Sequence, residues 1–442
     1  MSVIVAGGGI GGLTLALMLH ARGVPVTVFE QAPAIRELGV GVNTLPHAVK
    51  ELAALGLLPA LDACAVRTGE LVYVNRQGQE VWRERRGTEA GFEFPQFSVH
   101  RGRLQRVLHE AVLERLGEGA VRTGRRLAGV IQDEGGVTAH FVDARDGLAS
   151  ETARGEVLVA ADGIHSTVRR SFYPNEGPPS WQGVVLWRGA AEWPAFATGR
   201  SMVIGGGMGA KLALYPIAPG STPETRLTNW AIAVRVADGS DPPPRDSWSR
   251  TGRMDDAIPF ARRFRVPGVD VEGLVRATPV CFEYPMCDRD PLPRWSFGRV
   301  TLLGDAAHPM YPVGSNGAAQ AILDARALAN ALARAEHPAA ALAAYEEERA
   351  PKTAEIVRLN RSGGPERVID EVEKRAPAGF EDVDRVLSRA QREAIVKGYA
   401  GRAGFSLAQV NAAQVNAAQV NAAQASAAPS STVHASAARA GA

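Results

Sequence analysis

Three glycines near the N-terminus have the spacing of a phosphate-binding loop. The segment Gly7-x-Gly9-x-x-Gly12 follows a short apolar run and precedes a stretch of helix formers. In such a loop Gly7 permits a tight turn, Gly9 lets the backbone approach a pyrophosphate, and Gly12 lets the helix pack closely on the strand. Glu30 follows 18 positions after Gly12, where a carboxylate can accept hydrogen bonds from both hydroxyls of a ribose. The pattern predicts a dinucleotide site without distinguishing NAD from FAD.

A second apolar run, 157–161, also ends in an acidic residue. Asp162-Gly163 follows it, and then come a Ser/Thr pair and Arg169. By spacing alone, Asp162 either contributes to a ligand site or only caps the next helix. The sequence leaves these two interpretations open.

A third apolar run, 300–303, ends in Gly304-Asp305 and is followed by His308. His308 is a conceivable catalytic base, but a histidine that fixes the turn by hydrogen bonding is the favoured interpretation. A long alanine-rich helix is predicted from Gly317 to Ala335. Free N–H groups at its first turn could stabilise negative charge on a ligand.

These loops require a scaffold in which several strands end at one edge. Residues 1–30 are predicted to form a strand, loop, helix and strand in that order. Residues 184–236 contain strand-like runs with Trp and Tyr instead, which favours a second sheet. The predicted organisation is a first part of a nucleotide-binding domain (1–180, with a strand excursion at about 70–97), an inserted sheet domain (181–283), the return to the first domain (284–365), a helical extension (366–407) and a low-complexity tail (408–442).

Composition excludes several classes of protein. The chain has 442 residues, 45% of them hydrophobic, and a formal net charge of +2. This near-neutral balance gives no field that would attract nucleic acid. The apolar stretch Leu13–Leu19 is too short to span a bilayer, and without a basic n-region or a cleavage site a secretory signal is not expected. Three cysteines without C-x-x-C spacing predict neither disulfides nor a metal site, so we expect a cytoplasmic protein.

The three acid-ended runs in this order resemble the single-component flavoprotein monooxygenases that hydroxylate aromatic rings, the class typified by para-hydroxybenzoate hydroxylase. The resemblance implies an α/β fold with an α+β insert: a Rossmann-like FAD-binding domain and an inserted β-sheet substrate domain. Further segments resemble the phenazine carboxylate monooxygenases that form pyocyanin, and these segments are residues 37–43, 98–101, 187–189, 284–286 and 288–293.

The resemblance also implies roles for individual residues toward FAD. Arg101 would contact the pyrophosphate, the backbone at Leu127 would meet the adenine, and Val42 would flank the isoalloxazine. The start of the long helix would face the pyrimidine edge of the flavin and stabilise its reduced, anionic form. The predicted cofactor-binding residues are Gly7, Gly9, Gly11, Gly12, Glu30, Gln31, Val42, Arg101, Leu127, Asp162, Asp305, Asn316, Gly317 and Ala318.

The implied reaction is hydroxylation of an aromatic molecule by NAD(P)H and O2 through a C4a-hydroperoxyflavin. FAD would be held tightly without a covalent bond, and NADH or NADPH would dock transiently. No catalytic side chain is assigned, because the flavin carries the chemistry. The expected substrate is phenazine-, salicylate- or quinolone-like, and the enzyme would be a monomer or homodimer. Candidate pocket residues are Trp187, Tyr215, Trp230 and Pro312, together with Met202 and Tyr284. Arg188 either pairs with a substrate carboxylate or forms an interdomain salt bridge.

Other functions on a similar scaffold remain as alternatives. A flavin-dependent halogenase of this fold carries a W-x-W-x-x-P stretch, and the seven tryptophans here do not form one. A flavin-dependent reductase or a non-enzymatic binding protein would share the glycine motif. An NAD-dependent dehydrogenase would leave Gly304-Asp305 unexplained.

Overall fold

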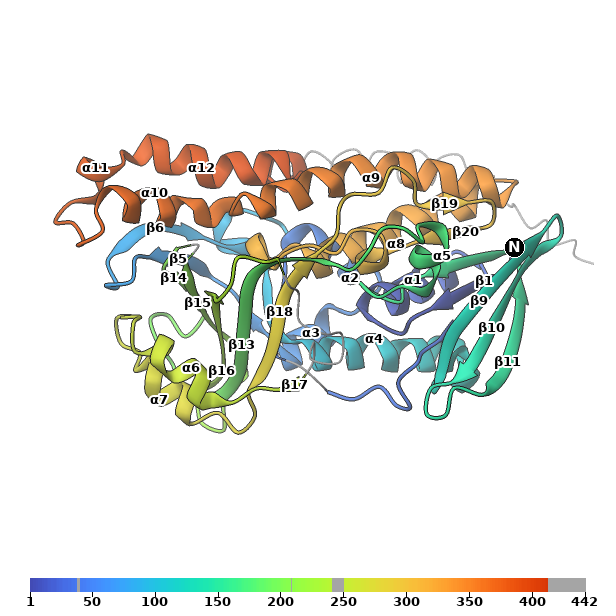
Figure 1. The fold of residues 1–442 in the computed structure, drawn as a ribbon, viewed down its shortest axis with the longest axis horizontal. Coiled ribbons are helices and arrows are strands. Elements are labelled where there is room, and N and C mark those ends of the chain that lie inside the picture. The colour runs from blue at the N-terminus through green and yellow to red at the C-terminus, as the bar shows by residue number, and fades with distance from the viewer. Residues whose placement is uncertain (38–39, 208, 241–249, 412–442) are drawn as a thin grey trace, which may run out of the picture.

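Figure 1 shows the computed structural model, which describes residues 1–37, 40–207, 209–240 and 250–411. A six-stranded sheet has the order β19-β20-β12-β1-β2-β8. Its inner strands are parallel and almost wholly apolar, as expected for strands covered on both faces. Their carboxyl ends therefore meet at one edge. The strands are β1 (Val3–Ala6), β2 (Val26–Phe29), β8 (Val121–Arg122), β12 (Val157–Ala160), β19 (Ser296–Phe297) and β20 (Val300–Leu302).

Helices cover this sheet and complete its core. The helix that follows the glycine loop is buried along nearly its whole length, since it packs between the sheet and two further helices. This explains why its sequence is apolar all round rather than on one face. The helices of this part are α1 (Ile10–His20), α2 (Pro46–Ala54), α3 (Leu58–Cys64), α4 (Arg101–Leu116), α5 (Thr167–Phe172), α8 (Gly317–Arg334) and α9 (Pro338–Arg361).

Two three-stranded sheets flank the parallel sheet. One is an antiparallel meander that projects beside β1 (Figure 1). The other carries the strand that borders the functional cleft. The meander consists of β9 (Arg125–Asp133), β10 (Gly136–Asp143) and β11 (Ala149–Gly155), and the second sheet of β3 (Gly41–Thr44), β7 (Phe97–His100) and β4 (Val66–Arg67).

The second part of the molecule is built on an eight-stranded sheet of order β17-β18-β13-β16-β15-β14-β5-β6. The predicted strand excursion at 70–97 supplies its last two strands. Every pairing is antiparallel except that of β14 with β5. The strands are β5 (Glu70–Val74), β6 (Glu80–Arg85), β13 (Ser180–Pro194), β14 (Ser201–Gly205), β15 (Ala210–Pro219), β16 (Thr225–Arg235), β17 (Arg250–Thr251) and β18 (Phe282–Asp288).

Each face of this large sheet is covered by a different group of helices. One face packs on α6 (Met254–Ala261) and α7 (Val271–Arg276). The opposite face packs on the C-terminal helices, which run along the top of the molecule in Figure 1. These are α10 (Arg367–Arg375), α11 (Val383–Val386) and α12 (Arg389–Arg402).

The predicted low-complexity tail begins at residue 408, and the structure describes its first residues up to Asn411. The chain forms a further helical turn from Leu407 to Asn411. Val410 is buried there against Leu45, Tyr399 and Phe405, so apolar packing overrides the repeat composition at this point. The rest of the predicted tail lies outside the described residues.

Within the described residues, no helix is both long and apolar enough to cross a membrane. The same part of the chain brings together no group of three side chains suited to a metal ion. Cys64, Cys281 and Cys287 are free thiols.

Candidate active site

The glycine loop after β1 packs as tightly as its spacing predicts, except at one position. Gly7 has φ of +116°, and a Cβ there would lie 2.2 Å from the Ala161 carbonyl oxygen. A Cβ on Gly12 would lie 2.0 Å from the Gly7 carbonyl oxygen, so α1 can approach β1 only with glycine at this position. A Cβ on Gly9 would meet no atom within 4 Å. Gly9 therefore borders open space, into which a ligand backbone or phosphate can fit.

That space is a cleft of about 1090 Å³ at the carboxyl edge of the parallel sheet. It is bordered by the ends of β1, β12 and β20, by β3, and by the starts of α4 and α8. Segments more than 300 residues apart in the sequence thus form one site. The predicted residues that line it are Gly9, Gly11, Val42, Arg101, Asp305, Asn316, Gly317 and Ala318.

Glu30, Gln31 and Leu127 lie beyond the cleft's lining. The Glu30 carboxylate accepts hydrogen bonds from the backbone N–H groups of Gly8 (2.6 Å) and Ala32 (2.7 Å). It thereby ties the end of β2 to the glycine loop, and its remaining lone pairs are free for a ribose. Gln31 borders a separate pocket between residues 31–33, 123–126 and 143–145, and the side chain of Leu127 is buried in β9.

Asp305 reaches into the cleft from the loop after β20. Its enclosure by protein raises the pKa of this carboxyl, while the charges of His308 and Arg101 lower it in part. Arg101, at the first position of α4, lines the same cleft. A cation and a carboxylate thus face the same volume, as binding of a ligand with both phosphates and hydroxyls requires.

A buried charge network fixes the loop that carries Asp305. Asp324 of α8 accepts hydrogen bonds from the Gly304 N–H (3.1 Å) and from Arg349 Nε (2.7 Å). Its carboxylate also contacts His308 Nε2 at 2.5 Å. Despite the desolvation, the charges of His308 and Arg349 hold the pKa of Asp324 at about 2. This geometry favours His308 as the residue that fixes the turn over His308 as a catalytic base.

The contacts of Asp162, in the loop after β12, agree with both interpretations of this residue. Asp162 Oδ2 accepts a hydrogen bond from the Thr167 N–H at 2.8 Å, and the Ser166 hydroxyl accepts one from the Arg169 N–H. Asp162 therefore caps α5, as one interpretation predicts. Its Oδ1 atom is buried and has no partner, and desolvation raises the pKa of the carboxyl. An acceptor is thus left over beside Gly163, which lines the cleft.

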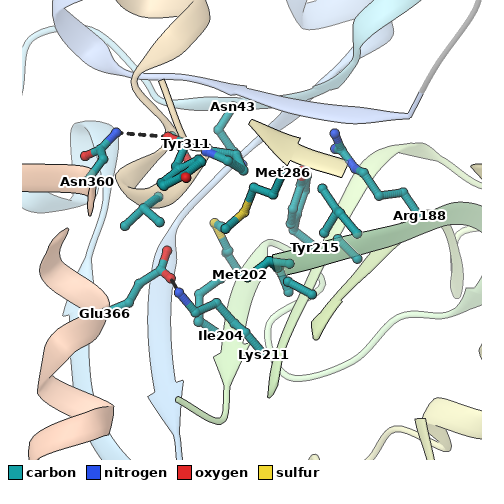
Figure 2. A pocket seen from close by; sticks show the side chains of 18 of the residues that line it. Asn43, Arg188, Met202, Ile204, Lys211, Tyr215, Met286, Tyr311, Asn360 and Glu366 are labelled. Atoms are coloured by element: carbon teal, nitrogen blue, oxygen red, sulfur yellow. Dashed lines mark hydrogen bonds and ion pairs between the residues drawn. The ribbon is translucent and has the colours of Figure 1, made fainter. Parts of the chain in front are cut away.

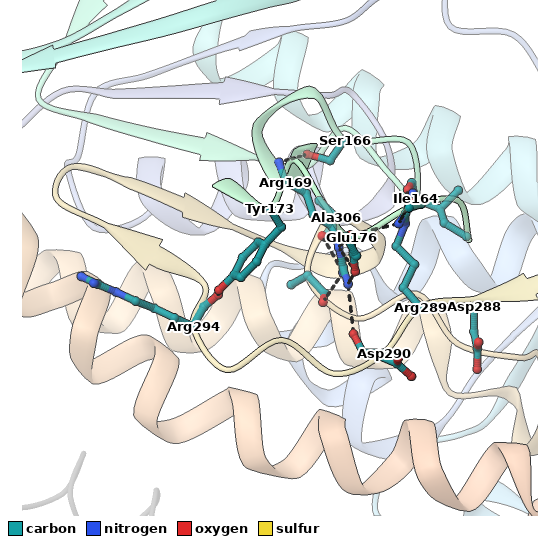
Figure 3. A network of polar contacts seen from close by, with 12 residues as sticks. Ile164, Ser166, Arg169, Tyr173, Glu176, Asp288, Arg289, Asp290, Arg294 and Ala306 are labelled. Carbon is teal, nitrogen blue, oxygen red and sulfur yellow. Dashed lines mark hydrogen bonds and ion pairs between the residues drawn. The ribbon is translucent and has the colours of Figure 1, made fainter. Parts of the chain in front are cut away.

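Arg169 connects this loop to the loop of Asp305 (Figure 3). Its side chain is 2% exposed and forms an ion pair with Glu176. Nη1 donates to the carbonyls of Ala306 (3.2 Å) and Ala307 (2.8 Å), and Nη2 donates to the Asp290 carbonyl (3.0 Å). The arginine therefore fixes the spacing between two loops that border the cleft.

A second cavity of about 920 Å³ adjoins the cleft, between the large sheet, the 311–315 segment and the chain that runs from the end of α9 to the start of α10 (Figure 2). Its wall is largely apolar, with Met202, Ile204 and Met286 among the lining residues. The two spaces share lining residues, so a molecule in the cavity would lie next to a molecule in the cleft. The shared residues are Asn43, Arg188, Tyr215, Pro312 and Ser315.

The structure places the predicted pocket residues on two faces of the sheet. Tyr215, Pro312 and Met202 line the cavity. Trp187 and Trp230 are not among its lining residues. Both are buried on the opposite face among the residues of α6 and α7, because side chains alternate between faces along a strand. Trp187 stacks on Phe260, and Trp230 donates a hydrogen bond to Thr278.

Tyr284 is also absent from the lining of both spaces. It lies near two arginines that line these spaces. Burial raises the pKa of Tyr284, and the charges of Arg188 and Arg101 lower it in part. Its register opposite Leu186 in the antiparallel pair of β18 and β13 accounts for this position.

Arg188 lies where the cavity meets the cleft. Its Nη2 atom donates to the Gly41 carbonyl of β3, so it links the large sheet to the first domain through a backbone hydrogen bond, whereas the prediction was a salt bridge. Its Nε atom is buried without a partner. A donor therefore remains for a ligand at this junction, and leaving such a donor unpaired costs about 1–3 kcal/mol.

Several residues that line the cavity were not predicted from the sequence. Lys211 and Glu366 form an ion pair across the cavity wall, and Tyr311 has a buried hydroxyl without a partner. Counting back in steps of two from Tyr215 gives Ala213 and Lys211, so strand alternation could have found the lysine. No sequence signal places Glu366 or Asn360 here, because they lie just before α10 and near the end of α9, far from the cavity strands in the sequence.

The profile of the FAD binding domain family, FAD_binding_3, matches residues 1–181 and 288–360, more than half of the chain. The chain is 42% identical over 362 residues to phenazine 1,6-dicarboxylic acid hydroxylase PhzS of Lysobacter antibioticus, covering 81% of this chain and 89% of the relative. The chain belongs to the FAD-dependent aromatic hydroxylases.

Other relatives of this hydroxylase agree with the assignment. The chain is 32% identical to 3-amino-4-hydroxybenzoate 2-monooxygenase PtnB3 of Streptomyces platensis, over 93% of this chain and 97% of the relative. Klebsiella pneumoniae HpxO, solved with FAD and uric acid, aligns with a TM-score of 0.71 at 25% identity, over 91% of this chain and 96% of HpxO. The family resemblance and the α/β fold with its inserted sheet are thereby confirmed. Hydroxylase activity is favoured over the reductase, halogenase and binding-protein alternatives.

The cofactor of this hydroxylase is FAD, and NAD(P)H is the reductant typical of such enzymes. The residues of the cleft fit a bound FAD. Gly9 leaves room beside the loop, and the first intrahelical bond of α8 is donated by Gln320. The N–H groups of residues 317–319 therefore have no helical acceptor and are available to a ligand.

Proposed function

We propose that this hydroxylase acts on a flat aromatic carboxylate of the phenazine, salicylate or quinolone kind, held in the 920 Å³ cavity. The observation that carries the proposal is the set of five residues shared between the cavity and the FAD cleft. An aromatic ring in the apolar cavity would lie against the reactive part of the cofactor. The hydroxylation of phenazine 1,6-dicarboxylic acid by the Lysobacter relative supports this substrate class.

The charges of the cavity support an anionic substrate. Among the described lining residues, Arg188, Lys211 and Arg235 are cationic and Glu366 alone is anionic. Glu366 pairs with Lys211, whereas Arg188 keeps an unpaired Nε donor at the junction with the cleft. We assign Arg188 to the substrate carboxylate, because a charge-assisted hydrogen bond in a confined site is strong.

The protein's own residues would place the substrate and exclude water. Bound FAD, reduced by NAD(P)H, would supply the electrons and activate O2 at the ring. The first turn of α8 would hold negative charge on the cofactor with its free N–H groups and helix dipole. The apolar wall, with Leu186, Met202 and Met286, would keep bulk water from the reacting atoms.

The remaining predicted roles complete the proposal. We assign the FAD-binding domain to residues 1–180 and 284–365 and the substrate domain to 181–283. Glu30 would hold the ribose of the ADP moiety, Gln31 and Leu127 would lie near the adenine, and Arg101 would contact the pyrophosphate. Free thiols are the ordinary state of cysteine in a reducing compartment, which supports a cytoplasmic enzyme. We also propose that the enzyme acts as a monomer or homodimer.

Filling the cavity should abolish hydroxylation without loss of FAD. Ala213 lies between Lys211 and Tyr215 on the cavity face of β15, so Ala213→Trp would occupy the space of an aromatic ring. We expect FAD binding to be retained and the hydroxylated product from phenazine-1-carboxylate, phenazine-1,6-dicarboxylate, salicylate or a 4-quinolone to fall at least about a hundredfold, as when a misplaced substrate loses its reactive geometry.

The readout is product measured by chromatography and mass spectrometry, with the total FAD content as reference. Ala149→Trp, at an exposed position on β11, is the matched control and should behave as wild type. Undiminished product from Ala213→Trp would exclude this cavity as the substrate site.

A further inference from the structure

A tyrosine of the C-terminal helix α12 contacts residues 312–317, a segment that borders both the cleft and the cavity. The Tyr399 hydroxyl accepts a hydrogen bond from Asn316 Nδ2 at 2.7 Å and donates one to Asn360 Oδ1 at 2.8 Å. All three side chains are at most 2% exposed. We infer that Tyr399 is a positioning residue for FAD, acting through the 312–317 segment, a role that rests on the proposed position of FAD in the cleft.

The segment that Tyr399 contacts forms part of both spaces. Pro312 and Ser315 line the cavity and the cleft alike, while Asn316 and Gly317 line the cleft. Asn316 is also the residue before the first turn of α8. A shift of this segment would therefore move the N–H groups that face the cofactor and the wall that faces the substrate together.

The backbone of the segment needs support from outside. Gly314 has φ of +67° and Ser315 has φ of +57°. A non-glycine residue in this left-handed region persists only where its surroundings enforce it. Tyr399 provides that enforcement by contact, since a Cβ on Gly314 would lie 2.5 Å from its hydroxyl oxygen. Asn360 adds a second hold, because its Nδ2 donates to the Tyr311 carbonyl at 2.9 Å (Figure 2).

The hydroxyl is used in both of its roles, as donor and as acceptor. Burial raises the pKa of Tyr399, so the group remains a neutral phenol and keeps the proton that it donates to Asn360. Phenylalanine at this position would leave one amide N–H of Asn316 and the Asn360 oxygen without this partner in a buried environment. The ring packing would be retained, which makes Tyr399→Phe a selective test of the hydroxyl.

Tyr399→Phe should loosen the segment and thereby alter the bound flavin. In the free protein the segment can relax, and FAD binding must then restore its order. We expect the FAD dissociation constant to rise about tenfold, the value that corresponds to one buried hydrogen bond. We also expect a more negative flavin midpoint potential, because the displaced α8 start stabilises the reduced anion less. Both quantities are measured without substrate, so failure to find an aromatic substrate would not affect this test.

Tyr345→Phe is the matched control. Tyr345 is a fully buried tyrosine of α9, and its hydroxyl donates to the Leu302 carbonyl, so the variant should lower the melting temperature without changing the flavin potential. The inference is overturned if the two variants act alike, with lower melting temperatures but unchanged potential and FAD affinity. If Tyr399→Phe does not fold, Asn360→Ser removes the acceptor of the same hydroxyl. It should shift the potential in the same direction, and an unchanged potential would equally overturn the inference.

Discussion

Replacing Gly9 with valine should give a folded protein that no longer binds FAD. Gly9 precedes α1 with extended backbone angles (φ −75°, ψ −176°), which valine adopts readily. A Cβ at this position meets no protein atom within 4 Å. The added side chain would instead occupy the cleft beside the loop where a pyrophosphate approaches.

The expected loss is large because a close backbone approach leaves no space for a branched side chain. We expect FAD affinity to fall more than about a thousandfold, roughly 4 kcal/mol, while a poorer helix cap costs the apoprotein only about 1 kcal/mol. Fluorescence titration with FAD and thermal unfolding of the apoprotein measure the two effects. Gly119→Val, another glycine with open space around its Cβ, is the control. A Gly9→Val protein with wild-type FAD affinity would refute the placement of the cofactor at this loop.

Replacing Arg169 with methionine should strongly destabilise the folded protein and its FAD site. The substitution removes a buried cation from Glu176 and leaves the carbonyls of Ala306, Ala307 and Asp290 without this donor. Glu176 keeps its ion pair with Arg289, so the main cost is the loss of the hydrogen bonds from a charged donor to buried carbonyls, about 1.5–3 kcal/mol each. Because the arginine spaces two loops of the cleft, FAD content should fall as well.

The urea midpoint of unfolding and the FAD content of the purified protein are the measurements. Arg170→Met supplies the comparison, since Arg170 is the adjacent residue but is exposed to solvent. Equal urea midpoints for the two variants would mean that the network in Figure 3 contributes nothing special to stability.

The sequence was informative where chemistry depends on local spacing. Gly7, Gly9, Gly12 and Asp305 could be predicted because each follows a buried strand within a few residues, and parallel strands bring their carboxyl ends to one edge. The inserted sheet was recognisable from its strand-like runs. Local pattern could not decide which face of that sheet would be lined by a cavity, and Trp187 and Trp230 lie on the face opposite to it.

The rest of the site depends on contacts between distant segments. Glu366 and Tyr399 reach the cavity region only because α10 and α12 pack along the face of the sheet. No sequence motif near either residue indicates a functional site. The burial of Val410 has the same cause, since the apolar residues of its cluster come from five separate segments. Composition alone marks its surroundings as low-complexity chain.

The central claim is that this chain uses FAD to transfer one oxygen atom from O2 to an aromatic acid in the cavity beside the cleft. The most direct measurement is the isotopic composition of the product formed under 18O2 from NADH and the phenazine, salicylate or quinolone that most stimulates NADH oxidation. The account predicts one 18O atom in each product molecule, and no such product from the Gly9→Val variant. Product oxygen derived from water, or NADH oxidation that yields only hydrogen peroxide with every aromatic acid tested, would contradict it.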